Sequence, residues 1–317
     1  MSNEFAAVTF GEPMAMFYAN EVGDLHEVHS FTRALAGAES NVAVGLSRLG
    51  HKTGYFTKLG NDHLGTYIRS AQDREGIDTS AIRIRNDRST GILIKAKTQS
   101  GDPKVEYFRH NSAASTLEVP DFDEAYFNRA GHLHATGITA ALSPTARAFS
   151  FHAMKHMRHQ GKTVSFDPNL RPVLWPDQET MVRTINELAA CCDWIFPGVN
   201  EGELLTGSSD PEKMASFYLE LGVKLVVIKL GPEGAYYKTE EEEGVVPGFR
   251  VDQVVDTVGA GDAFATGVIS ALLEREPLSE AVKRGNALGS LAVQAPGDMD
   301  GLPTRPELEA YLKRHGR

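Results

Sequence analysis

The residues with the clearest chemical content form a short run of glycine and aspartate near the C-terminus. The run reads Asp256-Thr257-Val258-Gly259-Ala260-Gly261-Asp262. The apolar stretch Val251–Val255 precedes it and Ala263–Leu273 follows with apolar residues at helical spacing, which predicts an extended segment, a tight turn and a helix N-terminus. Backbone N–H groups at a helix N-terminus attract an anion, and glycines let that anion approach closely. Asp262 would then stand beside the anion, where its carboxylate can accept a proton.

A carboxylate beside an anion site opposes simple anion binding but suits phosphoryl transfer. In that reaction a hydroxyl must be oriented and must lose its proton, while N–H dipoles hold the developing charge. The other interpretation of the same spacing is a helix N-terminus capped by an acidic residue near a glycine turn. The spacing by itself leaves both interpretations open.

The run resembles the C-terminal signature of the ribokinase-like (PfkB) family of carbohydrate kinases. The segment Gly37-Ala38-Glu39-Ser40-Asn41 is similar to the N-terminal glycine-rich element of the same family. This resemblance implies that Asp262 is the catalytic base. It also implies an anion hole formed by the backbone of Gly259, Ala260 and Gly261, and substrate contacts from Gly37, Ala38 and Asn41.

The resemblance extends to a metal site. Asn200 and Glu203 match the family's Asn-x-x-Glu element, which implies that they organise Mg²⁺, largely through water, around the phosphates of ATP. The alternative for this pair is an N-cap asparagine followed by a capping-box glutamate. Asp256 is expected, from the resemblance only, to help hold a monovalent cation such as K⁺.

The expected nucleotide site follows the apolar segment Leu225–Lys229. Lys229, Gly231 and Gly234 match the family's Lys/Arg-x-Gly-x-x-Gly element, which lines the nucleotide. The same resemblance places Asn286 near the adenine or the ribose of ATP.

The substrate side resembles kinases that act on 2-keto sugar acids, the 2-keto-3-deoxygluconate and 2-ketogluconate kinases. The similar segments are Lys104–Arg109 and Asp167–Pro172. They imply that Arg109 and Arg171 contact the substrate, at least one of them at its carboxylate, whose geometry suits a planar guanidinium. Tyr107 would pack over the sugar chain or hydrogen-bond to it.

The predicted reaction is transfer of the γ-phosphoryl group of ATP to the terminal primary hydroxyl of a 2-keto aldonate. Leu93 stands where the ketodeoxygluconate kinases tend to carry a tyrosine, so 2-ketogluconate remains a competing substrate. The alternatives are a fructokinase, ribokinase or nucleoside kinase of the same fold, and a non-catalytic protein that binds sugar acids. A dehydrogenase is disfavoured, because Phe264 occupies the third glycine position of a dinucleotide fingerprint.

Strand-like and helix-like segments alternate along the chain. The predicted strands are Phe5–Phe10, Lys52–Leu59, Ala81–Arg85, Gly131–Thr136, Thr163–Phe166, Trp194–Phe196 and Leu225–Lys229. The predicted helices are Ser40–Leu49, His63–Glu75, Pro144–Gln160, Gln178–Ala190 and Leu278–Val293. Alternation of this kind predicts an α/β fold, with a mostly parallel central sheet, helices on both faces and ligands at the carboxyl ends of the strands.

Two segments, about residues 12–35 and 90–112, interrupt this alternation with short strands and turns. The second contains a hairpin between Ile92–Lys97 and Lys104–Phe108, with Ser100-Gly101-Asp102-Pro103 as its turn. The resemblance implies that both segments form a small β-sheet lid over the sugar, within a single ribokinase-like domain that spans residues 1–317. A lid excludes the water that would compete with the sugar hydroxyl. An exposed apolar lid face also predicts a homo-oligomer that pairs through the lid.

The amino-acid composition limits which molecules the protein can be expected to bind. The 317 residues carry a formal net charge of −10, which argues against nucleic acid or an anionic membrane as a partner. Binding anionic ligands then requires local arginine or lysine residues. Cys191 and Cys192 are adjacent and do not suggest a disulfide framework. No basic leader and no apolar run of the ~20 residues that span a membrane is found, so the expected location is cytoplasmic.

Overall fold

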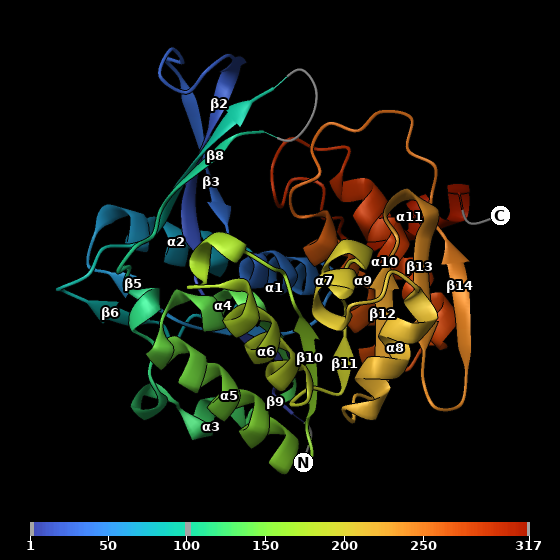
Figure 1. The fold of residues 1–317 in the computed structure, drawn as a ribbon. Coiled ribbons are helices and arrows are strands. Elements are labelled where there is room, and N and C mark those ends of the chain that lie inside the picture. The colour runs from blue at the N-terminus through green and yellow to red at the C-terminus, as the bar shows by residue number, and fades with distance from the viewer. Residues whose placement is uncertain (1–2, 99–102, 316–317) are drawn as a thin grey trace.

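The main element of the fold is an eight-stranded sheet with the strand order β14-β13-β12-β11-β10-β9-β1-β4 (Figure 1). The structure is a computed structural model that describes residues 3–98 and 103–315. The strands of this sheet are β1 (Phe5–Phe10), β4 (Thr53–Phe56), β9 (Ala130–Thr136), β10 (Thr163–Asp167), β11 (Trp194–Ile195), β12 (Leu225–Lys229), β13 (Gly234–Lys238) and β14 (Glu243–Pro247). All neighbours from β12 to β4 are parallel, and only β13 and β14 join antiparallel. The predicted mostly parallel sheet is confirmed.

Helices cover both faces of this sheet. One face packs against α5 (Pro144–His159), α6 (Gln178–Ala189) and α8 (Pro211–Glu220), and the other against α1 (Ala38–Arg48), α9 (Ala260–Leu273) and α10 (Leu278–Ala292). The remaining α-helices are α2 (His63–Arg74), α3 (Glu124–Phe127), α4 (Gly137–Leu142), α7 (Val199–Thr206) and α11 (Arg305–His315). Because successive side chains of a strand point to opposite faces, strands covered on both sides are apolar almost throughout.

Strand β12 shows this double burial directly. Val226 and Ile228 belong to the core under α5, α6 and α8, whereas Leu225 and Val227 belong to the core under α1, α9 and α10. Among the described residues, none of the helices combines the length and the hydropathy that crossing a bilayer requires.

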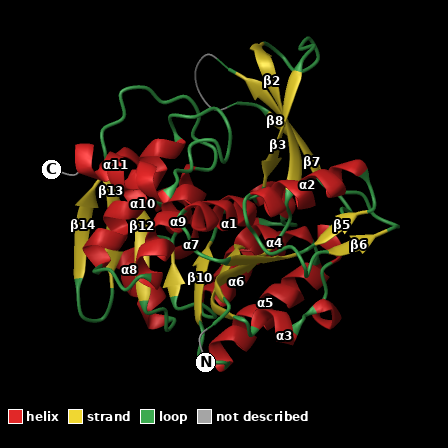
Figure 2. Cartoon of the chain, turned by 180° about the vertical axis from the view of Figure 1, so that it is seen from behind, coloured by secondary structure: helices red, strands yellow, loops and turns green. Residues whose placement is uncertain are grey.

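A second, four-stranded sheet with the order β3-β2-β7-β8 stands away from the main body (Figure 2). Its strands are β2 (Met14–Val22), β3 (Phe31–Ala36), β7 (Ile92–Lys97) and β8 (Val105–Phe108). They fall within the two segments expected to form a lid, and β7 and β8 form the expected antiparallel hairpin. The predicted turn at Ser100-Gly101-Asp102 lies outside the described residues.

The role of this small sheet as a lid, within a single domain, stays a prediction. Val22, Phe31 and Phe108 are exposed on its strands, which supports the expected pairing of two copies through the lid. The pairing also stays a prediction.

The prediction of one strand over Lys52–Leu59 is wrong. The chain forms β4 in the large sheet and then β5 (Lys58–Gly60), which pairs with β6 (Arg83–Arg85) in a separate two-stranded sheet. Thr57 marks the break, because its hydroxyl donates to the carbonyl of Gly11 at 2.6 Å and its own carbonyl accepts from the Arg83 N–H. A periodic apolar pattern cannot reveal such a change of sheet.

Helix α9 is held by unusually close contacts with its neighbours. Residues 262–271 of this helix are all buried. A Cβ atom on Gly267 would lie 2.6 Å from the carbonyl oxygen of Arg284 in α10, and one on Gly285 would lie 2.7 Å from the side chain of Val268. On the other side, a Cβ atom on Gly45 of α1 would lie 2.7 Å from Thr266. Glycines therefore fix where α9, and hence its N-terminus, lies between α1 and α10.

We expect Gly267→Ala to lower the free energy of unfolding by about 1–3 kcal/mol, the usual cost of overpacking a close helix contact. Gly289→Ala is the matched control in α10, because its Cβ atom would meet nothing closer than 3.5 Å. That control should leave stability unchanged or raise it by up to about 1 kcal/mol, since alanine favours a helix. Urea unfolding measures both, and equal stabilities of the two variants would contradict the role given to Gly267.

Candidate active site

The N-terminus of α9 forms the centre of the candidate site. Gly259 precedes the helix with φ of 80°, and a Cβ atom there would lie 2.7 Å from the carbonyl oxygen of Asp298. Glycine is required for both reasons. The helix begins at Ala260, earlier than the apolar pattern starts, so Gly261 and Asp262 lie in its first turn. The first N–H groups of a helix have no acceptor within it. In α9 the N–H of Ala260 donates to the carbonyl of Thr257 at 3.3 Å, so the N–H groups of Gly261 and Asp262 are the ones that suit an anion.

Asp262 is a buried carboxylate held by two asparagine side chains. Its Oδ2 accepts a hydrogen bond from Nδ2 of Asn41 at 2.7 Å, and its Oδ1 accepts one from Nδ2 of Asn169 at 3.0 Å. Burial raises the pKa of Asp262 to about 6, while the Asn41 hydrogen bond and the charges of Arg171 and Lys229 limit the rise. A carboxylate with this pKa is ionised at neutral pH and can still accept a proton during a reaction.

The carboxyl ends of two parallel strands supply the neighbours of Asp262. Lys229 ends β12 and Asp167 ends β10, and the Lys229 Nζ lies 2.7 Å from Asp167 Oδ2. A Cβ atom on Gly261 would lie only 3.4 Å from the same Nζ, so the ammonium group lies beside the glycine turn. Asn169 has a φ of 41°, a left-handed conformation that Asp167 supports by accepting from the Asn169 N–H at 3.1 Å.

Asn41 and its neighbours bring the N-terminus of α1 to the same place. Gly37 has a φ of 126°, and a Cβ atom there would lie 2.7 Å from the carbonyl oxygen of Glu12. Ala38 and Asn41 are buried in the first turn of α1. The Asn41 Oδ1 is buried and has no hydrogen-bond partner among the described residues.

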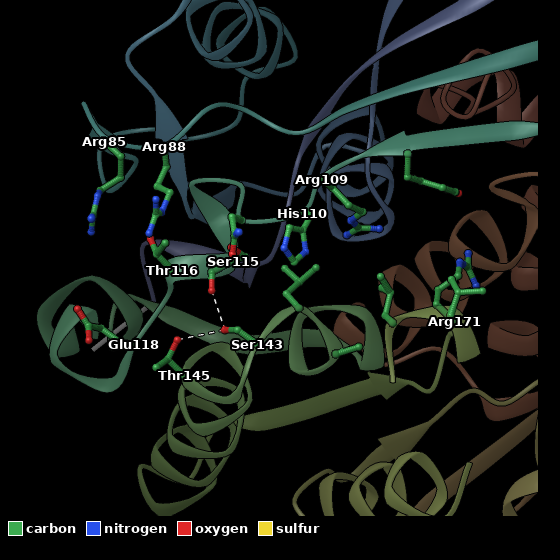
Figure 3. Close-up of a pocket in the computed structure, with 16 residues that line it drawn as sticks. Arg85, Arg88, Arg109, His110, Ser115, Thr116, Glu118, Ser143, Thr145 and Arg171 are labelled. Atoms are coloured by element: carbon green, nitrogen blue, oxygen red, sulfur yellow. Dashed lines mark hydrogen bonds between the residues drawn. The ribbon is translucent and has the colours of Figure 1, made fainter. Parts of the chain in front are cut away.

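A cavity of about 730 Å³ opens beside this centre, and Tyr107, Arg109 and Arg171 are among its lining residues. Figure 3 shows Arg171 at one end and Arg85 and Arg88 at the other, with Arg109 between them. The acidic chain thus concentrates positive charge at one place, as anionic ligands require. Asp262 does not line this cavity. Arg171 connects the two, because it lines the cavity and its charge acts on the carboxylate of Asp262.

Arg109 and Arg171 differ in how far their charges are already neutralised. Arg109 is buried, and its Nε donates to Oε2 of Glu12 at 2.6 Å. Glu12 is itself 2 % exposed and also accepts from the hydroxyl of Ser112. Arg171 is half-buried and, within the described residues, donates only to the carbonyl of Leu170, at 2.8 Å. Arg171 is therefore the freer partner for a carboxylate. Sequence reasoning missed Glu12, which belongs to no recognisable motif.

Asn200 and Glu203 lie on the first two turns of α7, and both are exposed. The capping interpretation of this pair is wrong, because the helix is capped at Gly198, whose N–H donates to the carboxylate of Glu201 at 2.8 Å. Within residues 3–98 and 103–315, no group of three or more His, Cys, Asp and Glu side chains could hold a metal ion by itself. The free oxygens of Asn200 and Glu203 fit Mg²⁺ that keeps phosphate and water as its other ligands.

The other expected nucleotide residues surround the turn between β12 and β13. Gly231 and Gly234 have φ angles of 63° and 107°, which only glycine adopts without strain. The buried Asn286 donates to the carbonyl oxygens of Val246 and Pro247, at 3.0 and 3.2 Å, and so holds the end of β14. A role for Asn286 at the adenine or the ribose stays a prediction.

Asp256 is already paired with a cation from the protein itself. Its carboxylate forms an ion pair with Lys95 of β7, and the same ammonium group lies 3.2 Å from Asp298 Oδ1. Sequence reasoning did not include Lys95, although a lysine within the buried strand Ile92–Lys97 is itself unusual. The carboxylate that the resemblance assigns to a monovalent cation thus pairs with Lys95 in this structure, and the cation role of Asp256 stays a prediction.

Comparisons with known proteins agree with this geometry. Residues 5–305 match the model of the pfkB family carbohydrate kinases. The chain is 59% identical over 307 residues to a 2-dehydro-3-deoxygluconokinase of Bacillus subtilis, covering 96% of this chain and 95% of that protein.

Two solved structures share the fold. One, described as a putative ribokinase II from E. coli in complex with ATP and Mg²⁺, has a TM-score of 0.90 and 27% identity, with 99% of this chain and all of that chain covered. The other is a fructokinase variant from Vibrio cholerae with fructose, ADP and potassium bound. It has a TM-score of 0.85 and 26% identity, and the match covers 98% of this chain and 100% of that chain. From the glycine turn, the sheet topology and these matches together, we conclude that the chain belongs to the pfkB family of carbohydrate kinases.

Proposed function

We propose that this protein is a 2-dehydro-3-deoxygluconokinase, which transfers the γ-phosphoryl group of ATP to the terminal primary hydroxyl of 2-keto-3-deoxygluconate. The observation that carries the proposal is the high identity, along almost the whole chain, to the Bacillus subtilis protein of that name. The cationic cavity lined by Tyr107, Arg109 and Arg171 supports an acidic sugar rather than a neutral one.

In the proposed reaction Asp262 takes the proton of the attacking hydroxyl. Asn41 and Asn169 hold its two carboxylate oxygens, so the carboxylate has a fixed direction before the substrate arrives. The backbone N–H groups of the Gly259–Gly261 turn and the ammonium of Lys229 stabilise the negative charge that develops on the phosphoryl oxygens. When bound, Mg²⁺ would neutralise phosphate charge, with Asn200 and Glu203 contacting its waters.

We place this reaction in the cytoplasm. The two cysteines, Cys191 and Cys192, are free and buried, which suits a reducing compartment.

A coupled assay of ADP release tests the substrate directly. We expect the highest kcat/KM with 2-keto-3-deoxygluconate, lower values with 2-ketogluconate, and values lower by at least about 100-fold with fructose or ribose, because a neutral sugar offers no carboxylate to the half-buried Arg171. A clear preference for 2-ketogluconate would select the competing keto acid, in agreement with Leu93. A preference for a neutral sugar would reject the class of sugar acids.

We expect Asp262→Asn to lower kcat by at least about 100-fold, the usual effect of losing a general base, while ATP and the sugar acid still bind. In the unchanged protein kcat/KM should fall about tenfold per pH unit below pH 6, because the base of the free enzyme is inactive once it is protonated.

The matched control for this change is Asp252→Asn, since the side chain of Asp252 is 90% exposed and forms an ion pair with the similarly exposed Arg250. Burial raises the pKa of Asp262 from its ordinary value of 3.8 to about 6, so its ionisation destabilises the fold as the pH rises between these two values, and the loss is complete at neutral pH. Asp262→Asn should therefore unfold at no lower temperature than the unchanged protein. Near-normal turnover, or a pH profile unaltered by the substitution, would rule out Asp262 as the base.

Arg171→Ala should raise KM for the keto acid by about 10- to 100-fold, because this fold-change corresponds to the free energy of one hydrogen bond to a charged group. The same substitution should change KM for fructose far less. Arg88→Ala is the informative comparison, because Arg88 lines the opposite end of the same cavity. Equal effects of Arg171→Ala on the acidic and the neutral sugar would remove the carboxylate assignment. A larger effect at Arg88 would move the carboxylate to the other end of the cavity.

A further inference from the structure

A buried lysine of the small sheet reaches the loops that support the glycine turn. Lys95 lies on β7, and its side chain is 3% exposed. Its partners, Asp256 and Asp298, have side chains 7% and 8% exposed and come from the loops before and after the pair of helices α9 and α10. Both loops curve toward the strands of the small sheet (Figure 1).

The two aspartates contact the turn that binds the anion. The Asp256 Oδ1 accepts a hydrogen bond from the N–H of Val258 at 3.0 Å. The backbone of Asp298 packs against Gly259, where a Cβ atom would lie 2.7 Å from its carbonyl oxygen. Whatever neutralises these two carboxylates therefore also determines the position of the turn.

Two buried carboxylates require a cation beside them, because an unpaired buried charge is strongly unfavourable. Lys95 supplies that charge. An alkali cation in the same place would satisfy the same oxygens.

We infer that the ammonium group of Lys95 takes the place of a monovalent cation beside the glycine turn, and that this protein neither binds nor needs K⁺ at Asp256. Lys95 is thus a positioning residue, which acts through Asp256 and Asp298 on the turn at Gly259. It also links the small sheet to the turn by a fixed charge. This inference departs from the cation site that the family resemblance implies.

Thermal unfolding without nucleotide or sugar tests the inference independently of catalysis. The protein is compared in potassium, sodium and choline chloride at equal ionic strength, as the unchanged chain, as Lys95→Met and as Lys97→Met. Lys97 is the matched control, because it lies on the same strand, is exposed and donates to the carbonyl of Asn20 rather than to a carboxylate near the turn. Lys95→Gln, which keeps a polar end without charge, replaces Lys95→Met if that variant does not fold.

We expect the melting temperature of the unchanged protein and of Lys97→Met to differ by less than about 1 °C between potassium and choline. Lys95→Met should unfold at a lower temperature in choline and recover at least about 3 °C in potassium, because a cation that binds only the folded state stabilises it. A potassium-specific rise in the unchanged protein would overturn the inference. So would a Lys95 variant that responds to potassium no more than the control does.

The activity readout rests on the proposed kinase function. The turnover of the unchanged enzyme should change less than about twofold between potassium and choline, whereas that of Lys95→Met should fall at least about tenfold in choline and rise again with potassium. If the unchanged protein phosphorylates no sugar acid, the proposed function fails, while the melting experiment still decides the role of Lys95.

Discussion

The close packing of α9 between α1 and α10 is the constraint on which the rest of the site depends. Gly267 and Gly285 let α9 and α10 pack so closely that a Cβ atom at either position would collide with the other helix. Gly45 allows the same close approach between α1 and α9. This packing fixes the N-terminus of α9 in space. The first turn of α9 then holds Asp262 against Asn41 of α1, which is the contact that gives the carboxylate its direction.

Around the N-terminus of α9, cationic side chains form ion pairs with carboxylates of the same chain. The chain as a whole is acidic, with a formal net charge of −10, yet Lys229, Arg109 and Arg171 converge on the region where anionic ligands are expected. Lys229 is held by Asp167 and Arg109 by Glu12, so each cation keeps a fixed position before any ligand binds. Fixed charges of this kind need no reorganisation as a reaction proceeds, which is the main source of electrostatic catalysis.

The small sheet is connected to the same region through side chains rather than through the main sheet. Arg109 follows β8 and contacts Glu12, which precedes β2. Lys95 of β7 contacts the loops at Asp256 and Asp298. The cavity lined by Arg109 and the glycine turn are therefore coupled to one four-stranded element, and a movement of that element would alter both. This arrangement suits a reaction from which water must be excluded.

The sequence by itself determined the local conformations and the residue types. The apolar periodicity located β1 and β12 with their observed bounds, and the glycine run located the start of α9, because spacing reports backbone geometry directly. Resemblance added the family and the role expected of Asp262. Only the tertiary structure decided the partners: Asn41 meets Asp262 across 221 residues, and Lys95 meets Asp298 across 203. Such pairs depend on how distant strands and helices pack. No local pattern records that arrangement, and the same reason explains why the break at Thr57 and the pairing of Lys95 with Asp256 went unpredicted.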